Sequence, residues 1–278
     1  MSRAYVSCVA TLALAAALSG AVPRPAPAFM GEGCAEKACV ECHTMAPEEA
    51  AQLLGGLVDR VLDVRPGRVP GLYAVDVEKN GRKIPIYIDF SKKFLVTGDV
   101  VALETRESLT KQRFIDLNPV DPSRIALDDA VVIGDPAAPS RIVVFDDPEC
   151  PYCRKLHPEM KQVAAERPDV AFFVKMLPLK IHPDARRKAR AIICARSAQM
   201  LDDSLAGRPV PDPTCETDQV EKNEKLAAEL GIRSTPTLVF PDGRVVPGYK
   251  SAAKILEYLD APRAGTKAEA GKAGAKAQ

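Results

Sequence analysis

The sequence has almost no excess of charge. Its 38 Lys and Arg residues balance 37 Asp and Glu residues, which leaves a formal net charge of +1. No stretch gathers charge of one sign, so a nucleic-acid partner has no electrostatic support. No internal repeat is visible at a solenoid period, and no apolar run after residue 28 is long enough to cross a bilayer. These absences leave a globular protein as the class of this chain, and 278 residues suffice for two modest domains.

The first 28 residues have the pattern of a secretory signal peptide. Arg3 supplies a positive charge, residues 6–22 form an apolar run, and Ala26-Pro27-Ala28 is a small-residue cleavage site before Phe29. The alternative is an uncleaved membrane anchor, which the short, Ala-rich run disfavours. We therefore expect export to an oxidising compartment, where cysteines form disulfides or do redox work.

Cysteines are the residues after position 28 with the clearest chemical role. An odd number follows residue 28, so at least one must be free, joined to another chain, or bound to something else. These cysteines are Cys34, Cys39, Cys42, Cys150, Cys153, Cys194 and Cys215.

The first half of the chain predicts a short Cys-rich segment and a small domain. Residues 29–46 are polar and Cys-rich, and Pro47 opens a predicted helix over residues 47–62. Residues 71–103 alternate apolar and polar side chains around an Asn80-Gly81 hairpin signal, which indicates an antiparallel sheet of about four strands. A sheet this small, with long edges, favours pairing with a second copy. We place this domain at residues 47–110.

The second half predicts an α/β domain. Prolines mark residues 111–132 as a linker that is helical at most in part. Strands and helices then alternate over residues 133–260, which indicates an α/β layer. The tail of residues 261–278 has too few apolar side chains to order itself. We predict strands at 141–145, 170–175, 237–240 and 244–246, and helices at 151–166, 183–206, 218–230 and 251–259.

Cys150-Pro151-Tyr152-Cys153 is the motif with the clearest chemistry. Cys150 is predicted at a strand end, at the start of a helix whose N–H groups and dipole favour a thiolate. That thiolate would attack a substrate disulfide, and Cys153, one turn later, would resolve the mixed disulfide. A structural bridge or half a zinc site is the alternative, but His157 is the only further ligand nearby.

Four segments of the sequence carry a family resemblance. They are Phe145-Asp-Asp-Pro-Glu-Cys-Pro-Tyr-Cys-Arg-Lys-Leu-His157, Ile193-Cys-Ala195, Ser234-Thr-Pro-Thr-Leu-Val-Phe240 and Asp242-Gly-Arg-Val-Val-Pro-Gly-Tyr249. Together they resemble the DsbC/DsbG family of bacterial periplasmic disulfide isomerases. The resemblance implies a thioredoxin-like catalytic domain after a cystatin-like dimerisation domain of one helix and an antiparallel sheet. It further implies a V-shaped periplasmic homodimer that acts on misfolded or oxidised exported proteins and is kept reduced by a DsbD-type membrane electron donor.

The resemblance also implies roles for single residues. Thr235 and Pro236 match the cis-proline loop that thioredoxin-like folds place beside the active cysteines. Cys194 and Cys215 match a second, structural disulfide of the family, and the alternative is a second redox pair.

Some residues depart from the family pattern. The dipeptide between the cysteines is Pro-Tyr, Arg154 stands where His is usual, and the linker carries prolines in place of a long helix. These departures leave open the balance between isomerase, reductase and oxidase, because the residues between the cysteines help set the redox potential.

Cys39-Val40-Glu41-Cys42-His43 lies outside the resemblance and has the pattern of c-type haem attachment. The thiols of Cys39 and Cys42 would bind the haem, and His43 would be the proximal iron ligand. A zinc site that adds Cys34, or a local disulfide with one free thiol, are the alternatives. The thiol chemistry itself needs no cofactor, and we predict no other metal site.

Several functions compete for this sequence. The leading one is a dimeric isomerase or reductase, with a dithiol oxidase as its rival. The non-enzyme rivals are a haem-linked electron carrier and a holdase-type chaperone. His157 lies on the same helix face as Cys150 about two turns away, and we predict a surface or packing histidine there, with a catalytic histidine as the alternative.

Overall fold

The computed structural model describes residues 43–261. The chain divides into a unit of residues 1–44 and a unit of residues 45–278, and the fold below belongs to the second. The predicted signal peptide, Cys34, Cys39, Cys42 and the tail from residue 262 onward lie outside the described residues. No helix within residues 43–261 combines the length and the apolar character that a membrane crossing requires.

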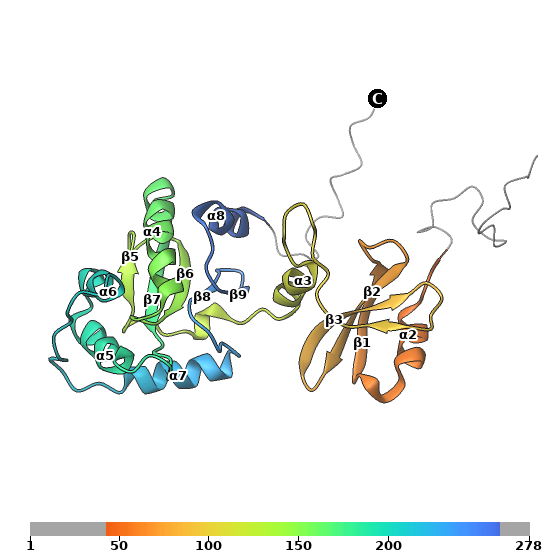
Figure 1. The fold of residues 1–278 in the computed structure, drawn as a ribbon, viewed down its shortest axis with the longest axis horizontal. Coiled ribbons are helices and arrows are strands. Elements are labelled where there is room, and N and C mark those ends of the chain that lie inside the picture. Colours follow the sequence, from red (N-terminus) through yellow and green to blue (C-terminus); the bar gives the residue numbers. More distant parts are fainter. Residues whose placement is uncertain (1–42, 262–278) are drawn as a thin grey trace, which may run out of the picture. The chain divides into compact units, whose positions relative to one another are not determined.

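The N-terminal sheet has four antiparallel strands in the order β1-β2-β3-β4 (Figure 1). Tyr73, Val75 and Val77 alternate along β2 and face the same core as Ala50 and Leu54 of helix α2. This alternation with period two is what lets one face of the sheet bury its apolar side chains. The elements are α2 Pro47–Leu54, β1 Arg60–Pro66, β2 Leu72–Lys79, β3 Arg82–Asp89 and β4 Leu95–Val96.

The predicted helix over residues 47–62 is wrong in its second half. Helix α2 ends at Leu54 because Gly55 takes a positive φ of 51°, and a short 3₁₀ turn, Gly55–Leu57, follows. The chain then enters β1. Residues 71–103 therefore contain three of the four strands, and β1 lies before residue 71. The hairpin signal is confirmed, since Asn80 and Gly81 both adopt positive φ, 52° and 71°.

Helix α3, Leu109–Leu117, packs against β3 and is fastened to the sheet by Asp76. Asp76 is fully buried on β2, on the face opposite Val75 and Val77. Its carboxylate accepts from Arg113 of α3 at 2.6 Å and from Arg65 of β1 at 2.6 Å. The stretch predicted as a linker thus contains a helix, and a 3₁₀ turn at Pro122–Arg124 follows it.

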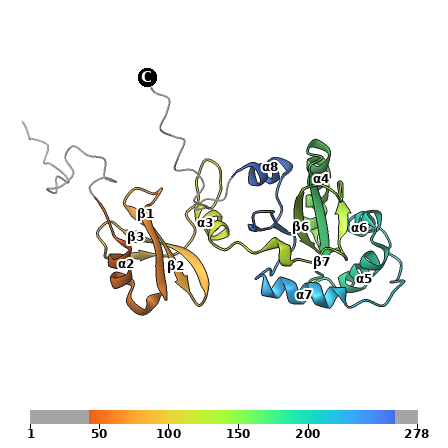
Figure 2. The same ribbon diagram turned by 180° about the vertical axis from the view of Figure 1, so that it is seen from behind.

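The second sheet has the strand order β5-β7-β6-β8-β9 (Figure 1), and Figure 2 shows its strands β6 and β7 from behind. β6 and β7 are parallel, and the other pairs are antiparallel. The predicted strands are all present, and β5 is an addition, since its three residues are too short for a periodic signal. The strands are β5 Val131–Ile133, β6 Ser140–Asp146, β7 Val170–Met176, β8 Thr237–Val239 and β9 Val245–Pro247.

Helices cover both faces of this sheet, which confirms the predicted α/β class. Ile142 and Val144 of β6 pack in the core that contains α4 and α8, whereas Val143 and Phe145 pack in the core that contains Ala227 of α7. The predicted 183–206 helix is two helices, because Arg196 adopts the left-handed conformation with φ 47°. The helices are α4 Pro151–Glu166, α5 Ala185–Ala195, α6 Ala198–Leu205, α7 Gln219–Glu229 and α8 Ala252–Asp260.

Candidate active site

The dithiol lies where β6 leads into α4. Cys150 is the N-cap residue of α4 with extended backbone, and Pro151 occupies the first turn, where its missing N–H leaves no donor unpaired. The Cys150 N–H donates to the Asp147 carbonyl at 3.0 Å, which closes the turn between strand and helix. Cys150 is 4% exposed and Cys153 is fully buried, and both are free thiols.

The surroundings of Cys150 favour its thiolate. A hydrogen bond from the Cys153 thiol lowers the pKa of Cys150 from 9.0 to about 6, against the opposing effect of burial. The backbone N–H groups of Cys153 and Tyr152 and the Thr235 side chain act in the same direction. The two N–H groups are the unpaired donors of a helix N-terminus, so the start of α4 itself helps to stabilise the nucleophile.

Cys153 is shifted in the opposite direction. Burial raises the pKa of the Cys153 thiol, and its hydrogen bond to Cys150 and the charge of Asp146 add to the shift. At neutral pH the pair therefore consists of a thiolate at Cys150 and a protonated thiol at Cys153. This asymmetry divides the chemistry into an attacking and a resolving sulfur.

The loop before β8 brings Thr235 and Pro236 beside Cys150. The Thr235-Pro236 bond is cis, and the Cys150 thiol lies 3.5 Å from the Thr235 carbonyl oxygen. The approach follows from the sheet, because Phe145 of β6 pairs with Thr237 of β8. The sheet thus brings the segments of Cys150 and of Thr235-Pro236 side by side.

Cys194 and Cys215 form a disulfide with a Cα–Cα distance of 5.7 Å. It connects the end of α5 to the segment before α7. Of the predicted haem ligands only His43 belongs to the described residues, and residues 43–261 contain no group of three or more side chains that could hold a metal ion.

His157 is not a surface residue, which corrects one of the two interpretations above. It is 4% exposed on α4, and its Nε2 lies 2.7 Å from Oδ2 of Asp146, the last residue of β6. Sequence reasoning missed Asp146, although a charged pair, Asp146-Asp147, directly after an apolar strand was the available signal.

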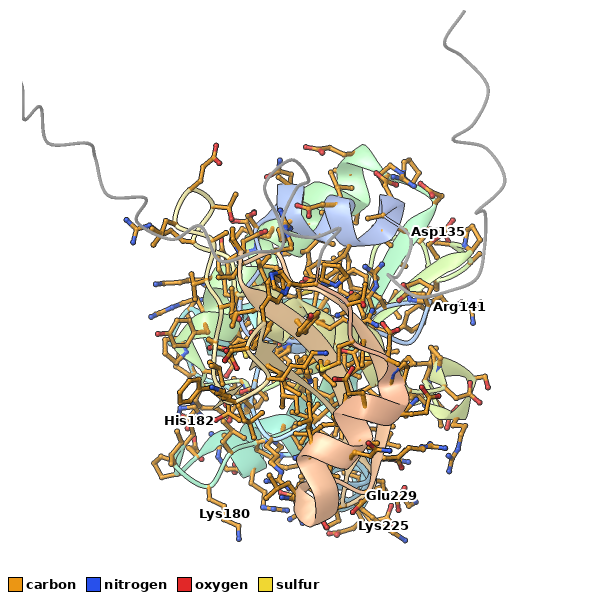
Figure 3. All side chains as sticks on the ribbon, turned by 90° about the vertical axis from the view of Figure 1, so that its right-hand side faces the viewer. Asp135, Arg141, Lys180, His182, Lys225 and Glu229 are labelled. Atoms are coloured by element: carbon orange, nitrogen blue, oxygen red, sulfur yellow. A yellow bond between two sulfur atoms is a disulfide. The ribbon has the colours of Figure 1, made fainter. Side chains whose placement is uncertain are left out.

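Asp147 fastens a neighbouring loop to the active-site turn. Its Oδ2 accepts from the Leu179 N–H at 2.6 Å and lies 2.8 Å from Nδ1 of His182. Figure 3 labels His182 and Lys180, two residues of this loop. Glu149 makes a second connection through Lys188 of α5 at 2.7 Å. The residues just before Cys150 therefore hold the segment that leads into α5.

Two family descriptions match most of the chain between them. Residues 44–111 match the disulfide bond isomerase protein N-terminal domain, and residues 128–262 match a thioredoxin-like domain. The two matches fall on the two sheets described above.

Curated proteins of the same kind are similar to this chain. A probable thiol:disulfide interchange protein DsbC of Bordetella avium is 30% identical over 175 residues, which are 62% of this chain and 61% of the relative. The thiol:disulfide interchange protein DsbC of Escherichia coli K12 is 29% identical over 203 residues, which are 71% of this chain and 80% of the relative. A crystal structure of a disulfide interchange protein from Neisseria gonorrhoeae is 32% identical, with a TM-score of 0.42, and the match covers 49% of this chain and 96% of that one.

Proposed function

Because this chain belongs to the DsbC family of thiol:disulfide interchange proteins, we propose that it reduces and rearranges the disulfides of exported proteins through Cys150 and Cys153. The observation that carries the proposal is the placement of the two thiols: Cys150 caps α4 beside the cis Thr235-Pro236 bond, and Cys153 is fully buried one turn later. The pKa of Cys150 is lowered to about 6, and the pKa of Cys153 is raised by burial. Cys150 is therefore the attacking sulfur, and Cys153 is the resolving sulfur.

The proposed reaction moves two electrons and two protons from the dithiol to the substrate. The Cys150 thiolate attacks one sulfur of the substrate disulfide, and the other substrate sulfur leaves with the bonding electron pair. Cys153 then attacks Cys150 Sγ, which forms the Cys150–Cys153 disulfide and releases the second substrate sulfur. In isomerisation a thiol of the substrate makes the second attack, and Cys150 returns unchanged.

Refolding of scrambled ribonuclease tests this assignment. Cys150→Ala should abolish the recovery of ribonuclease activity, because no nucleophile is left to open the wrong disulfides. Cys153→Ala keeps the attack but not the resolution, so substrate should accumulate in mixed disulfides with Cys150. These species run at high mass on a non-reducing gel and disappear with reductant. Full activity of Cys150→Ala would refute the proposal.

A dithiol oxidase is the second candidate, and the lowered pKa of Cys150 favours it. Whatever stabilises the thiolate also stabilises the reduced form, so the disulfide becomes a stronger oxidant. A measured reduction potential, together with assays on fully reduced and on scrambled ribonuclease, separates the two. We expect the dithiol form to rearrange scrambled substrate faster than the disulfide form oxidises reduced substrate. The reverse order would assign the oxidase.

We propose that the N-terminal sheet pairs two copies of the chain. Strand β4 lies at one edge of the sheet. Its two residues and the residue before it carry exposed apolar side chains: Phe94 is 67% exposed, Leu95 43% and Val96 42%. An apolar outer strand is suited to pairing with another sheet. Sedimentation should give the mass of two chains for the wild type and of one chain for Leu95→Lys. A monomeric wild type would contradict the dimer.

We further propose that the protein works in the periplasm, where a DsbD-type membrane donor keeps the dithiol reduced. Alkylation of free thiols in whole cells reports the redox state of Cys150 and Cys153. Removal of the donor should convert the pair to the disulfide, and an unchanged dithiol would assign its reduction to another source.

The haem hypothesis for Cys39, Cys42 and His43 needs its own test, because the thiol chemistry requires no cofactor. Protein purified from a host that matures c-type cytochromes should show a Soret band and a haem-stained gel band if haem is attached. A colourless product would leave the zinc site and the local disulfide as the alternatives.

A further inference from the structure

Three carboxylates precede Cys150 in the active-site turn, and each has a basic partner. Asp146 and Asp147 are fully buried beside histidines, and Glu149 forms an ion pair with Lys188 at 2.7 Å. None of these three carboxylates therefore presents an unpaired negative charge to the solvent beside the Cys150 sulfur.

Cationic side chains close to the dithiol have no such partner. Arg154, Lys155, Lys180 and Arg233 are exposed, and no carboxylate within residues 43–261 forms an ion pair with any of them. Ion pairs are common elsewhere in the same domain, for example between α5 and α7. These four unpaired side chains form a cationic rim.

Helix α4 places two members of the rim. Arg154 follows Cys150 by four residues, so it lies on the same helix face, about 6 Å further along the axis. The Lys155 ammonium lies 5.6 Å from the ring centroid of Tyr152, which stands between the two cysteines. Both charges therefore lie near the sulfur that attacks the substrate.

Loops that contact the active-site turn place the other two members. Lys180 belongs to the loop that the Asp147 carboxylate holds through a hydrogen bond of 2.6 Å. Arg233 precedes Thr235 by two residues, and the Thr235 carbonyl oxygen lies 3.5 Å from the Cys150 sulfur. The rim thus comes from three separate segments, which the pairing of β6 with β7 and β8 brings to one edge of the sheet.

A surface cavity of about 350 Å³ extends the rim along α4. Arg154 lines it together with Lys161 and Arg208. Asp202, the one carboxylate of the lining, binds Lys161 at 2.5 Å and faces His157 Nδ1 at 3.4 Å. A carboxylate that enters the cavity therefore meets Arg154 as an unpaired guanidinium, whose fork of N–H groups fits both carboxylate oxygens.

We propose that the cationic rim recognises acidic polypeptide segments, so that the protein acts preferentially on disulfides with Asp or Glu two to three residues from a cysteine. This inference rests on the proposed function and names its substrate class. An extended segment covers about 3.3 Å per residue, so a side chain two to three residues from the attacked sulfur passes Arg154. The rim attracts such a partner before the attack and favours its correct register.

Three small disulfides separate the recognition of charge from the reactivity of the thiol. Dithiodipropionate carries two carboxylates, hydroxyethyl disulfide carries no charge, and cystamine carries two ammonium groups. Alkylation of quenched samples reports the loss of the dithiol and gives a second-order rate constant for each. Raising the ionic strength from about 0.01 to 1 M should slow the anionic disulfide and speed the cationic one, because the Debye length falls from about 30 to 3 Å.

Arg154→Gln and Arg233→Gln each remove one charge of the rim and keep a polar side chain. Each rate constant is divided by that of hydroxyethyl disulfide, which cancels any change in the reactivity of Cys150 itself. At low salt each variant should slow dithiodipropionate about twofold and speed cystamine about twofold, as expected for one unit charge acting across about 8 Å of water. The double variant should show about the product of the two effects.

Arg141→Gln is the matched control. Arg141 is also exposed and has no ion pair with a carboxylate in the described part of the chain, but it lies near the start of β6, far from the dithiol. Figure 3 shows Arg141 and Lys180 on opposite sides of the domain. The control changes the net charge by the same amount and should leave the normalised rate constants unchanged.

A pair of peptide disulfides extends the test to the proposed substrate class. The two peptides have equal length and differ only in Glu or Gln three residues from the disulfide-bonded cysteine. With the wild type the Glu peptide should react at least about twofold faster at low salt, and the double variant should lose this preference. Equal rates with the wild type, or an effect of Arg141→Gln as large as that of Arg154→Gln, would overturn the proposal. A wild type that leaves hydroxyethyl disulfide unreacted would instead contradict the proposed function.

Discussion

The thiol of Cys150 lies 3.5 Å from the carbonyl oxygen of Thr235, although 85 residues separate them along the chain. The contact exists because β6 and β8 are neighbouring antiparallel strands, which brings the start of α4 and the cis Thr235-Pro236 loop together. It also places the Thr235 side chain among the groups that lower the pKa of Cys150.

Alkylation of Cys150 should titrate near pH 6. The pKa of this thiol is lowered from 9.0 to about 6, so the thiolate dominates above pH 6 and is lost below it. The rate of reaction of the wild type with iodoacetamide should fall as the pH drops through 6, and the Cys153→Ala variant is measured beside it. Since the Cys153 thiol donates to Cys150, the variant should titrate at higher pH than the wild type.

The stability of the reduced protein should depend on pH in the same range. For an acid whose pKa is lowered on folding, the unfolded state binds more protons between the two values, so stability rises with pH there. The contribution of Cys150 is thus fully present above about pH 9 and lost as the pH falls through 6. Urea unfolding of reduced wild type and of Cys150→Ala, compared from pH 5 to 9, measures it. A difference between the two that stays constant with pH would contradict the lowered pKa.

Thr235→Val should raise the pKa of Cys150. The hydroxyl of Thr235 has no oxygen or nitrogen partner among residues 43–261, and its interaction with Cys150 favours the thiolate. At pH 6 the reactivity should drop several-fold, since a shift of one unit changes the thiolate fraction by up to about tenfold. Thiolate absorbance against pH measures the shift. The control is Thr237→Val, whose hydroxyl donates to the Ser234 carbonyl instead, and an equal shift in both variants would assign the effect to the loop.

Replacing both Cys194 and Cys215 by Ala should lower the stability but leave the chemistry intact. The disulfide closes a loop between residues 21 apart, and such a closure stabilises by about 3 kcal/mol in the chain-entropy model. Denaturant unfolding gives the loss, and ribonuclease refolding gives the activity. If redox titration of the Cys150→Ala/Cys153→Ala variant showed a reversible second couple at physiological potentials, the second-redox-pair alternative would be correct.

Asp76→Asn should loosen α3 from the N-terminal sheet. The carboxylate is fully buried between Arg65 and Arg113, whose side chains are 35% and 21% exposed. Removing one member of a buried ion pair costs about 3 kcal/mol or more, and the partial exposure of the arginines brings the expected loss to about 2–3 kcal/mol. Asp63→Asn is the matched control, because Asp63 also bonds Arg65 but is 51% exposed, so it should cost less than about 1 kcal/mol. Equal losses would contradict the special role of burial.

Elements with a local signal were predictable from the sequence. Helix α4 has the predicted bounds, since Pro151 fixes its first turn, and the Asn80-Gly81 hairpin follows from two residues that tolerate positive φ. Errors occurred where one residue changes the backbone inside an apolar pattern. Gly55 ends α2 eight residues early, and Arg196 divides the predicted 183–206 helix, although Arg is not a residue that signals a break.

The sequence by itself determined the dithiol, its helix and the strand before it, because all three lie in one short stretch of chain with local signals. Only the tertiary structure decided what faces the second sulfur. Asp146 and His157 are 11 residues apart, and neither has a motif that joins it to Cys153 or to Asp202. Their contact requires α4 to pack on the sheet and against α6, and packing of that kind is set by the whole core.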